Sequence, residues 1–209
     1  MTSRGRPRNF DRSHALACAM RVFWAKGYEG AQLVDLTAAM GINPPSFYAA
    51  FGSKQAIFRE AVDLYLGTAG AGAMRALEET AATRDAVENM LKASADVALA
   101  APGSGGCLVI LGLVNGLAEN EPSRAYLQDI RRQTIERVRE RLDRGLREGD
   151  LIAGTDTARL ATFYAAVMQG LSLQARDGAS RDELDGVVAA AMSALDGGRS
   201  PQAMPGRRG

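Results

Sequence analysis

Residues 33–54 (LVDLTAAMGINPPSFYAAFGSK) restrict the fold most, because they contain two short helical patterns separated by a glycine. Apolar residues at spacings of three and four give the first helix one apolar face. Gly41 can adopt the positive φ that ends a helix. Asn43 can cap a second helix that has Pro44 at its first position. The second helix is too short and too apolar to be stable alone, so it must be held on a scaffold.

Two helices joined by a turn of about three to four residues with a glycine form the helix-turn-helix pattern. In such a unit the second helix enters the major groove of DNA. The alternative is an ordinary helical hairpin inside a bundle of helices. The pattern alone leaves both interpretations open.

The rest of the 209-residue chain also has helical character. Ala, Leu, Arg, Glu and Met are frequent, and runs of β-branched residues are absent. No apolar stretch reaches the roughly 18 residues of a transmembrane helix, and the basic N-terminus lacks the apolar core of a secretion signal. We therefore expect an all-α, cytoplasmic protein with no membrane partner.

The net charge of +1 conceals an uneven distribution. Residues 1–59 contain eight Lys or Arg and three Asp or Glu, a net charge of +5, whereas the remainder has a net charge of −4. A basic N-terminal region on an acidic body can meet phosphates with one end only. This distribution favours a nucleic-acid partner for the N-terminal region.

Helical periodicity and its interruptions predict about nine helices. They cover residues 11–26, 33–40, 44–51, 54–82, 84–101, 106–118, 122–149, 156–177 and 180–195. Within the seventh helix, residues 123–148 interleave many arginines with acidic residues at helical spacing. This stretch could be a second nucleic-acid surface, but we favour a solvated face with weak ion pairs.

Residues 11–66 resemble the DNA-binding region of the TetR family of bacterial transcriptional regulators. The matching residues are Ala15, Phe23, Gly27, Tyr28, Leu36, Gly41, Ile42, Phe47, Tyr48, Phe51, Ser53, Lys54 and Phe58. The resemblance is weaker beyond this region, although 106–108 and 169–171 look like positions in one branch of the family. It implies an all-helical homodimer that binds a palindromic operator on double-stranded DNA, usually as a repressor, and releases it when a small molecule binds.

The resemblance also implies a division into parts. We expect an N-terminal three-helix head that contains the helix-turn-helix, followed by a helical domain for ligand binding and dimerisation. The predicted boundaries are a basic flexible arm (1–10), the DNA-binding domain (11–55), the effector-binding and dimerisation domain (56–195) and a disordered tail (196–209). The long helix predicted at 54–82 would connect the head to the body and transmit the effector signal.

By resemblance, Pro45, Ser46 and Tyr48 fall where family members contact DNA. Lys54 falls where a lysine meets a phosphate at a helix N-terminus, a position that itself favours anions. Tyr48 could instead be a core residue. Gln32 replaces the usual Ser or Thr cap, although its amide could still reach a phosphate. The predicted DNA-binding residues are Arg4, Arg6, Arg8, Gln32, Asn43, Pro45, Ser46, Phe47, Tyr48, Ala49 and Lys54.

The arm contains the sequence Arg4-Gly5-Arg6-Pro7, which has the core of AT-hook segments. Arginines in such segments insert into narrow minor grooves, where the negative potential is enhanced. The alternative is a charged tail that raises affinity without selecting a sequence. The sequence does not decide between these two interpretations.

Cys107 follows two glycines and opens the predicted helix 106–118, where the helix dipole could lower its thiol pKa. That arrangement suits a switch operated by an oxidant or an electrophile. Most free cysteines act as small buried apolar residues, and no Lys, Arg or His lies near Cys107 in sequence, so we favour that interpretation. Cys18 is expected in the core. The sole histidine, His14, and two distant cysteines lack metal-site spacing, so we expect no metal or other cofactor.

A cavity for an unknown small-molecule effector is expected in the body. Its predicted lining is Met74, Met90, Cys107, Leu111, Asn115, Tyr126, Phe163, Tyr164 and Met168, although each of these could simply be a core residue. The last two predicted helices carry small and apolar residues that allow close packing, so we expect them to form the dimer interface. Its predicted residues are Ala161, Ala165, Gly170, Val187, Val188 and Ala191.

Three functions remain to be compared. We favour a homodimeric repressor that a small molecule releases from its operator. The same repressor could instead be switched by oxidation or electrophile modification of Cys107. A helical enzyme or carrier is the remote alternative, because the sequence shows no paired catalytic carboxylates, nucleophile with a base or phosphate-binding loop.

Overall fold

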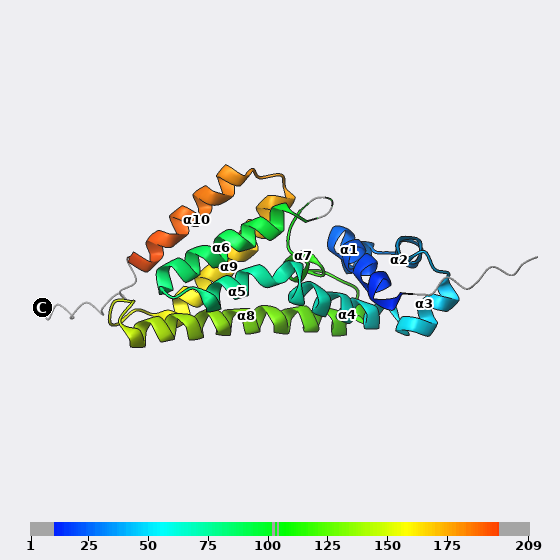
Figure 1. Cartoon of the computed structure of the whole chain (residues 1–209), viewed down its shortest axis with the longest axis horizontal. Coiled ribbons are helices and arrows are strands. Elements are labelled where there is room, and N and C mark those ends of the chain that lie inside the picture. Colours follow the sequence, from blue (N-terminus) through cyan, green and yellow to red (C-terminus); the bar gives the residue numbers. More distant parts are fainter. Residues whose placement is uncertain (1–10, 102, 104, 197–209) are drawn as a thin grey trace, which may run out of the picture.

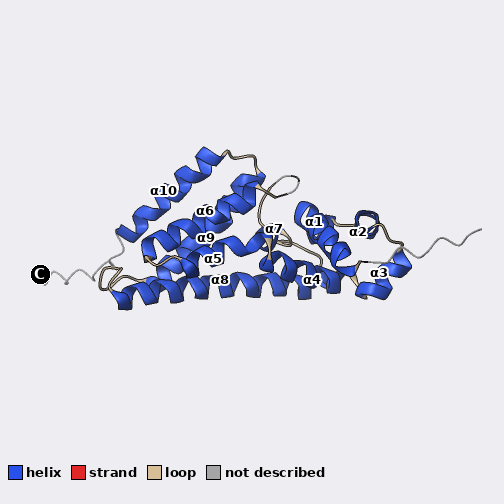
Figure 2. Cartoon of the chain, viewed as in Figure 1, coloured by secondary structure: helices blue, strands red, loops and turns tan. Residues whose placement is uncertain are grey.

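The computed structural model describes residues 11–101, 103 and 105–196, and Figure 1 shows their arrangement. Every regular element in these residues is a helix, as Figure 2 shows, so the predicted all-α fold is confirmed. The predicted arm with Arg4, Arg6 and Arg8, and residues 197–209 of the predicted tail, lie outside the described residues. In the described part we find no helix with the length and apolar character that a membrane crossing requires.

The described residues form ten α-helices and two short 3₁₀ segments. The head and the connection contain α1 (Arg12–Gly30), α2 (Leu33–Met40), α3 (Pro44–Phe51), α4 (Lys54–Gly67) and η1 (Ala69–Ala71). The body contains α5 (Gly72–Glu79), α6 (Thr83–Leu99), α7 (Leu108–Leu111), η2 (Ala118–Asn120), α8 (Glu121–Glu148), α9 (Thr157–Arg176) and α10 (Arg181–Asp196). Figure 1 shows α1–α3 at one end of an elongated molecule, with α8 running along the body.

The helix-turn-helix forms where the sequence predicts it. Gly41 closes α2 with a φ of 68°, and the side chain of Asn43 accepts a hydrogen bond from the Ser46 amide at 2.9 Å. Both signals are local, which explains why the sequence predicts them well. Leu36 and Phe47 are fully buried, in a core cluster that also contains residues of α1 and α4. This cluster is the scaffold that the short α3 requires.

Helix α1 continues past the predicted end at residue 26. Gly27 has a φ of 69° and kinks the helix, which then runs to Gly30. The kink directs the Tyr28 amide to the carbonyl oxygen of Gly112, 2.7 Å away. A Cβ on Gly27 would lie 3.0 Å from that oxygen. Glycine is therefore required at position 27 for two reasons: the φ is positive, and the backbone of Gly112 leaves no room for a side chain.

Two predicted helices are wrong. The helix predicted at 54–82 ends at Gly67, where Thr68 has φ −129° and ψ −100°, and the chain restarts as η1 and α5. Three glycines in 67–72 lower helix propensity there, and a Cβ on Gly70 would lie 2.4 Å from the Tyr65 ring. The helix predicted at 106–118 shrinks to α7, because the backbone beyond it bonds to α1 instead.

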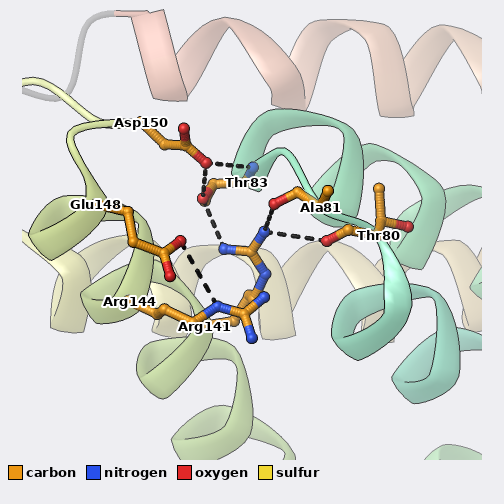
Figure 3. Close-up of polar contacts among 7 residues, drawn as sticks. All are labelled: Thr80, Ala81, Thr83, Arg141, Arg144, Glu148 and Asp150. Carbon is orange, nitrogen blue, oxygen red and sulfur yellow. Dashed lines mark hydrogen bonds and ion pairs between the residues drawn. The ribbon is translucent and has the colours of Figure 1, made fainter.

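The body has its own core cluster, formed mainly by α6, α8, α9 and α10. The loop between α5 and α6 is fixed to α8 by the buried guanidinium of Arg141 (Figure 3). This group donates to the Thr83 hydroxyl at 2.6 Å and to the Ala81 carbonyl at 2.7 Å. Asp150 accepts from the amide and the hydroxyl of Thr83 at 3.0 and 2.9 Å.

The other arginines of α8 mostly behave as the sequence predicts. Arg124, Arg132 and Arg139 form ion pairs with carboxylates three or four residues away. The structure thus supports a solvated, ion-paired face. Arg131 and Arg141 are the departures from this pattern, because Arg141 is buried and Arg131 is half-buried.

Candidate nucleic-acid interface and ligand cavity

The outer face of α3 is open to solvent. Pro45, Ser46 and Ala49 are exposed, and Tyr48 is 52% exposed. Tyr48 is therefore a surface residue and not a core residue. The prediction that Phe47 contacts DNA is wrong, because its side chain is 0% exposed. It packs against Phe51 with ring centroids 6.0 Å apart and so supports α3 from inside the head. The helical period places residue 47 on the opposite face from its neighbours.

The remaining predicted DNA contacts surround α3. Gln32 is exposed just before α2, and its amide donates to the Glu29 carbonyl at 3.2 Å. Asn43 is exposed, with its side chain engaged in capping α3. Lys54 begins α4 and is half-buried, with Nζ 4.5 Å from the centroid of the Tyr28 ring. Burial lowers the pKa of Lys54 from its usual value.

Arg12 fixes the C-terminal end of α3. Its Nε donates to the Ala50 carbonyl at 3.4 Å, and its guanidinium lies 4.7 Å from the centroid of the Phe51 ring. The same group pairs with Glu60 of α4 at 2.8 Å. One side chain of α1 therefore connects α3 to both helices that support it.

A cavity of about 80 Å³ lies in the body, between α4, α6, α8, α9 and the 107–110 segment. Its walls are mainly apolar. A larger polar opening between η1, α5 and α8 is adjacent to it and shares Leu66, Gly70, Met74, Ile130 and Thr134. The lining residues of the inner cavity are Tyr65, Leu66, Gly70, Ala73, Met74, Ser94, Val97, Cys107, Val109, Ile110, Ile130, Arg131, Thr134, Ala165, Met168, Gln169 and Ser172.

Of the predicted lining residues, Met74, Cys107 and Met168 lie in this cavity. The other six do not, because apolar periodicity does not separate cavity walls from core or surface. Met90 and Tyr164 are in the core, Leu111 and Tyr126 are half-buried elsewhere, and Asn115 and Phe163 are exposed. The Tyr126 hydroxyl donates to Asp63 of α4, and burial is the main cause that raises its pKa to about 12.

Cys107 contacts two cavity residues. Its Sγ accepts a hydrogen bond from the Tyr65 hydroxyl at 3.1 Å, and its amide donates to the Ser172 hydroxyl at 2.7 Å. Burial raises the pKa of Cys107, although Tyr65 and the more distant charge of Arg131 act in the opposite direction. The thiol is therefore protonated at neutral pH. The backbone amides of Val109 and Ile110 at the start of the four-residue α7 do lower the pKa of Cys107, but the effect of burial is larger.

The cavity wall is joined to the head by the end of α1. The Trp24 indole donates to the Gly106 carbonyl at 2.7 Å, and the Tyr28 amide donates to Gly112. The Glu29 carboxylate accepts from the Leu117 amide at 3.1 Å and from the Asn120 side chain at 2.7 Å. Trp24 and Glu29 are not among the functional residues predicted from the sequence. Trp24, the sole tryptophan, could have been singled out as a large side chain with one donor.

The predicted dimer interface is partly corrected. Four of its residues, Ala161, Ala165, Val188 and Ala191, are buried in the protomer's own core. Gly170 and Val187 are half-buried. The solvent-facing stripe of α9 instead includes Phe163, 40% exposed, and Leu173, 51% exposed. Both helices are apolar on two sides, so sequence alone did not distinguish the inner from the outer face.

The fold and the exposed face of α3 define a class: a helix-turn-helix DNA-binding protein with a helical, cavity-containing body. Residues 15–61 match the family described as "Bacterial regulatory proteins, tetR family", and residues 74–192 match "Tetracyclin repressor-like, C-terminal domain". The chain belongs to the TetR family and is a DNA-binding transcriptional regulator.

Relatives cover most of the chain. The transcriptional repressor ComR of Escherichia coli is 33% identical over 87% of both chains. The repressor BdcR of the same organism is 30% identical over 91% of this chain and 92% of its own. A solved cysteine mutant of the regulator CifR, complexed with 26 bp double-strand operator DNA, has a TM-score of 0.85 and 46% identity, covering 90% of this chain and 99% of that one.

The described residues contain no group of three or more His, Cys, Asp or Glu side chains arranged to hold a metal ion. Cys18 is buried, with its Sγ 3.6 Å from Nε2 of His14.

Proposed function

We propose that the chain is a homodimeric repressor that binds a palindromic operator through α3 and is released when a small molecule fills the body cavity. The observation that carries the proposal is the outward face of α3, where Ser46 and Tyr48 are exposed while Phe47, on the inner side of the same helix, is fully buried. The named functions of ComR and BdcR and the operator DNA bound to CifR support it.

Dimerisation is proposed through the outer faces of α9 and α10. Phe163, Ala166 and Leu173 of α9 are exposed, with Gly170 half-buried between them. A Cβ on Gly170 would meet nothing within 4 Å, so a second chain could approach closely there. A four-helix bundle of this kind would hold two copies of α3 on the order of 34 Å apart, one turn of the duplex.

Release would follow the contacts between the cavity and α1. The 105–112 segment contributes cavity residues and also accepts the hydrogen bonds of Trp24 and Tyr28. A ligand that fits only one arrangement of this segment changes the position of the head and lowers its affinity for DNA. In this scheme α4 alone does not carry the signal, because it ends at Gly67.

A mobility-shift titration with the chain's own upstream DNA tests the proposal. Tyr48→Ala should weaken binding by about tenfold or more, the cost of losing one good groove contact. Ile152→Ala removes another exposed apolar side chain, 45% exposed and remote from α3, and should leave the affinity unchanged. Wild-type protein that fails to bind this DNA at low salt, or Tyr48→Ala protein that binds equally well, would contradict the proposal.

A thiol switch at Cys107 is a second candidate, because this residue lies in the cavity wall. Its raised pKa makes it a slow nucleophile, which favours a non-covalent effector. Cys107→Ser protein that no longer leaves DNA upon treatment with an oxidant or electrophile would establish the switch. Unchanged release would eliminate it.

A further inference from the structure

Arg131 is unusual among the residues of the inner cavity. It projects from α8 and is half-buried, and among the described residues that line the cavity it is the sole charged one. Two other groups that line the cavity can ionise, the Tyr65 hydroxyl and the Cys107 thiol. Both are uncharged near neutral pH, because burial raises both pKa values. The cavity therefore has one fixed positive charge in mostly apolar surroundings.

No carboxylate neutralises this charge within the part of the chain that the structure describes. The Nη1 atom of Arg131 donates to the Val109 carbonyl at 2.7 Å. Its neighbour Arg132, in contrast, pairs with Asp129 at 3.1 Å. Withdrawing a charge from water is unfavourable unless a counter-charge is present, and burial correspondingly lowers the pKa of Arg131. A guanidinium has five N–H donors, so a fork remains for a planar anion.

Three other polar side chains of the cavity already have partners within the protein. The Ser94 hydroxyl donates to the Met90 carbonyl at 2.8 Å, and the Ser172 hydroxyl accepts from the Cys107 amide. The Thr134 hydroxyl donates to the Ile130 carbonyl at 3.0 Å. Apart from Gln169, whose side chain is exposed, the remaining wall is apolar, so it suits hydrocarbon and offers little to a second polar group. A volume of about 80 Å³ holds roughly five to eight water-sized groups.

We propose that the effector is a small monocarboxylate with an apolar tail of about three to five carbons, and that its carboxylate binds Arg131. This inference rests on the proposed function, since it names the ligand class of the same cavity. A carboxylate bound through the remaining N–H groups draws the guanidinium toward the ligand and weakens its hydrogen bond to the Val109 carbonyl. It would thereby loosen α7, whose flanking residues Gly106 and Gly112 hold α1. The charge of the ligand is thus coupled directly to the position of the head.

The test compares pentanoate, 1-pentanol and pentylammonium at pH 7 and constant ionic strength, by thermal shift and calorimetry of the full chain. Pentanoate should stabilise the wild type with a saturating dose response, as mass action requires, and bind at least about tenfold more tightly than the other two. Arg131→Gln should remove this preference. Arg132→Gln makes the same chemical change one residue away, at a side chain 74% exposed, and should leave the preference intact.

Arg131→Lys retains the charge without the planar fork and should bind pentanoate with intermediate affinity. If Arg131→Gln does not fold, Arg131→Lys provides the test of the role of Arg131. Equal binding of pentanoate and 1-pentanol, undiminished binding by both Arg131 variants, or no binding of any of the three compounds would overturn the inference. None of these results affects operator binding by the unliganded protein. Failure of that binding is the separate result that would overturn the proposed function.

Discussion

The indole nitrogen of Trp24 donates a hydrogen bond to the carbonyl oxygen of Gly106 at 2.7 Å. Trp24 belongs to α1 of the head, whereas Gly106 directly precedes Cys107 in the cavity wall. The same indole lies edge-on to the Tyr65 ring, with centroids 5.0 Å apart. A single buried side chain of the head therefore contacts two parts of the cavity wall, and any displacement of that wall reaches α1 directly.

Trp24→Phe should destabilise the protein and weaken the coupling between cavity and DNA. The variant retains an aromatic ring but leaves the Gly106 carbonyl without its donor, at a cost of about 1–3 kcal/mol. Urea unfolding measures the loss of stability. Operator titrations with and without the effector measure the coupling, which should shrink because the head no longer follows the wall.

Tyr126→Phe is the control for that experiment. It also removes one hydrogen-bonding group between helices, the hydroxyl that donates to Asp63, but Tyr126 is not a cavity-lining residue. Its effector response should equal that of the wild type. If Trp24→Phe protein responds to the effector as fully as the control does, the route through α1 is wrong.

The sequence predicts the head well because its signals are local. A glycine with φ of 68° and an asparagine that caps the next helix at 2.9 Å fix the turn of the helix-turn-helix through neighbouring residues. The apolar spacing identifies Leu36 as core in the same way. The resemblance adds the surface role of Tyr48, and its 52% exposure is compatible with that role.

Long-range contacts account for what the sequence does not predict. Nothing near residue 112 indicates that its carbonyl bonds to Tyr28, so the 106–118 stretch looks like one continuous helix. Arg131 and Arg132 are adjacent and chemically identical, yet one lines a cavity and the other is 74% exposed. Such distinctions depend on helix rotation within the assembled body, which charge spacing does not specify.

Leu173→Glu should convert the proposed dimer to monomers. This side chain is 51% exposed on the outer stripe of α9, so the glutamate costs the isolated protomer little but places two desolvated charges in a two-fold interface. Gel filtration with light scattering should show the mass of one chain, and operator affinity should fall because two heads no longer bind together. Thr162→Glu, at an exposed position about three turns earlier in the same helix, tests how far the interface extends along α9.

A dimer that persists in both glutamate variants would exclude the outer face of α9. Dissociation by Leu173→Glu alone would confine the interface to the C-terminal part of α9. Retained secondary structure by circular dichroism is required in each case, because the prediction concerns association and not folding.

Asp150→Asn should make stability less dependent on acid pH. The pKa of Asp150 is lowered first by the Thr83 amide that donates to it and then by the Thr83 hydroxyl (Figure 3). A carboxyl whose folded-state pKa is lowered stabilises the fold above its unfolded pKa of about 3.9, and this contribution is lost as pH falls through the folded-state value. Wild type should therefore be more stable than the variant at pH 7, with the difference shrinking below about pH 4.

Urea unfolding of both proteins across that pH range measures the difference directly. Asp129→Asn is the matched control, because Asp129 is 61% exposed and pairs with the exposed Arg132, so its variant should have nearly the same stability as the wild type. A difference between Asp150→Asn and wild type that is constant with pH would show that the Asp150 charge does not stabilise the α5–α6 loop.

Arg12→Ala should weaken operator binding by displacing α3, not by removing a phosphate contact. Arg12 bonds to the Ala50 carbonyl, covers the Phe51 ring and pairs with Glu60, so its guanidinium is engaged within the head. The affinity should fall several-fold, while the slope of log affinity against log salt should stay constant. Loss of a true phosphate contact would instead reduce that slope by about 0.9. Because the Arg12–Glu60 pair is partly exposed, stability should change by no more than about 1 kcal/mol.

Glu60→Gln separates the two explanations for Arg12, since it frees the guanidinium without removing a positive charge. If Arg12 positions α3, Glu60→Gln should weaken DNA binding in the same direction, and the double variant should lose less than the sum of the single losses. If Arg12 binds phosphate, Glu60→Gln should strengthen binding, because the guanidinium is no longer neutralised by its partner at 2.8 Å. The sign of the Glu60→Gln effect therefore decides whether Arg12 positions the recognition helix or binds DNA itself.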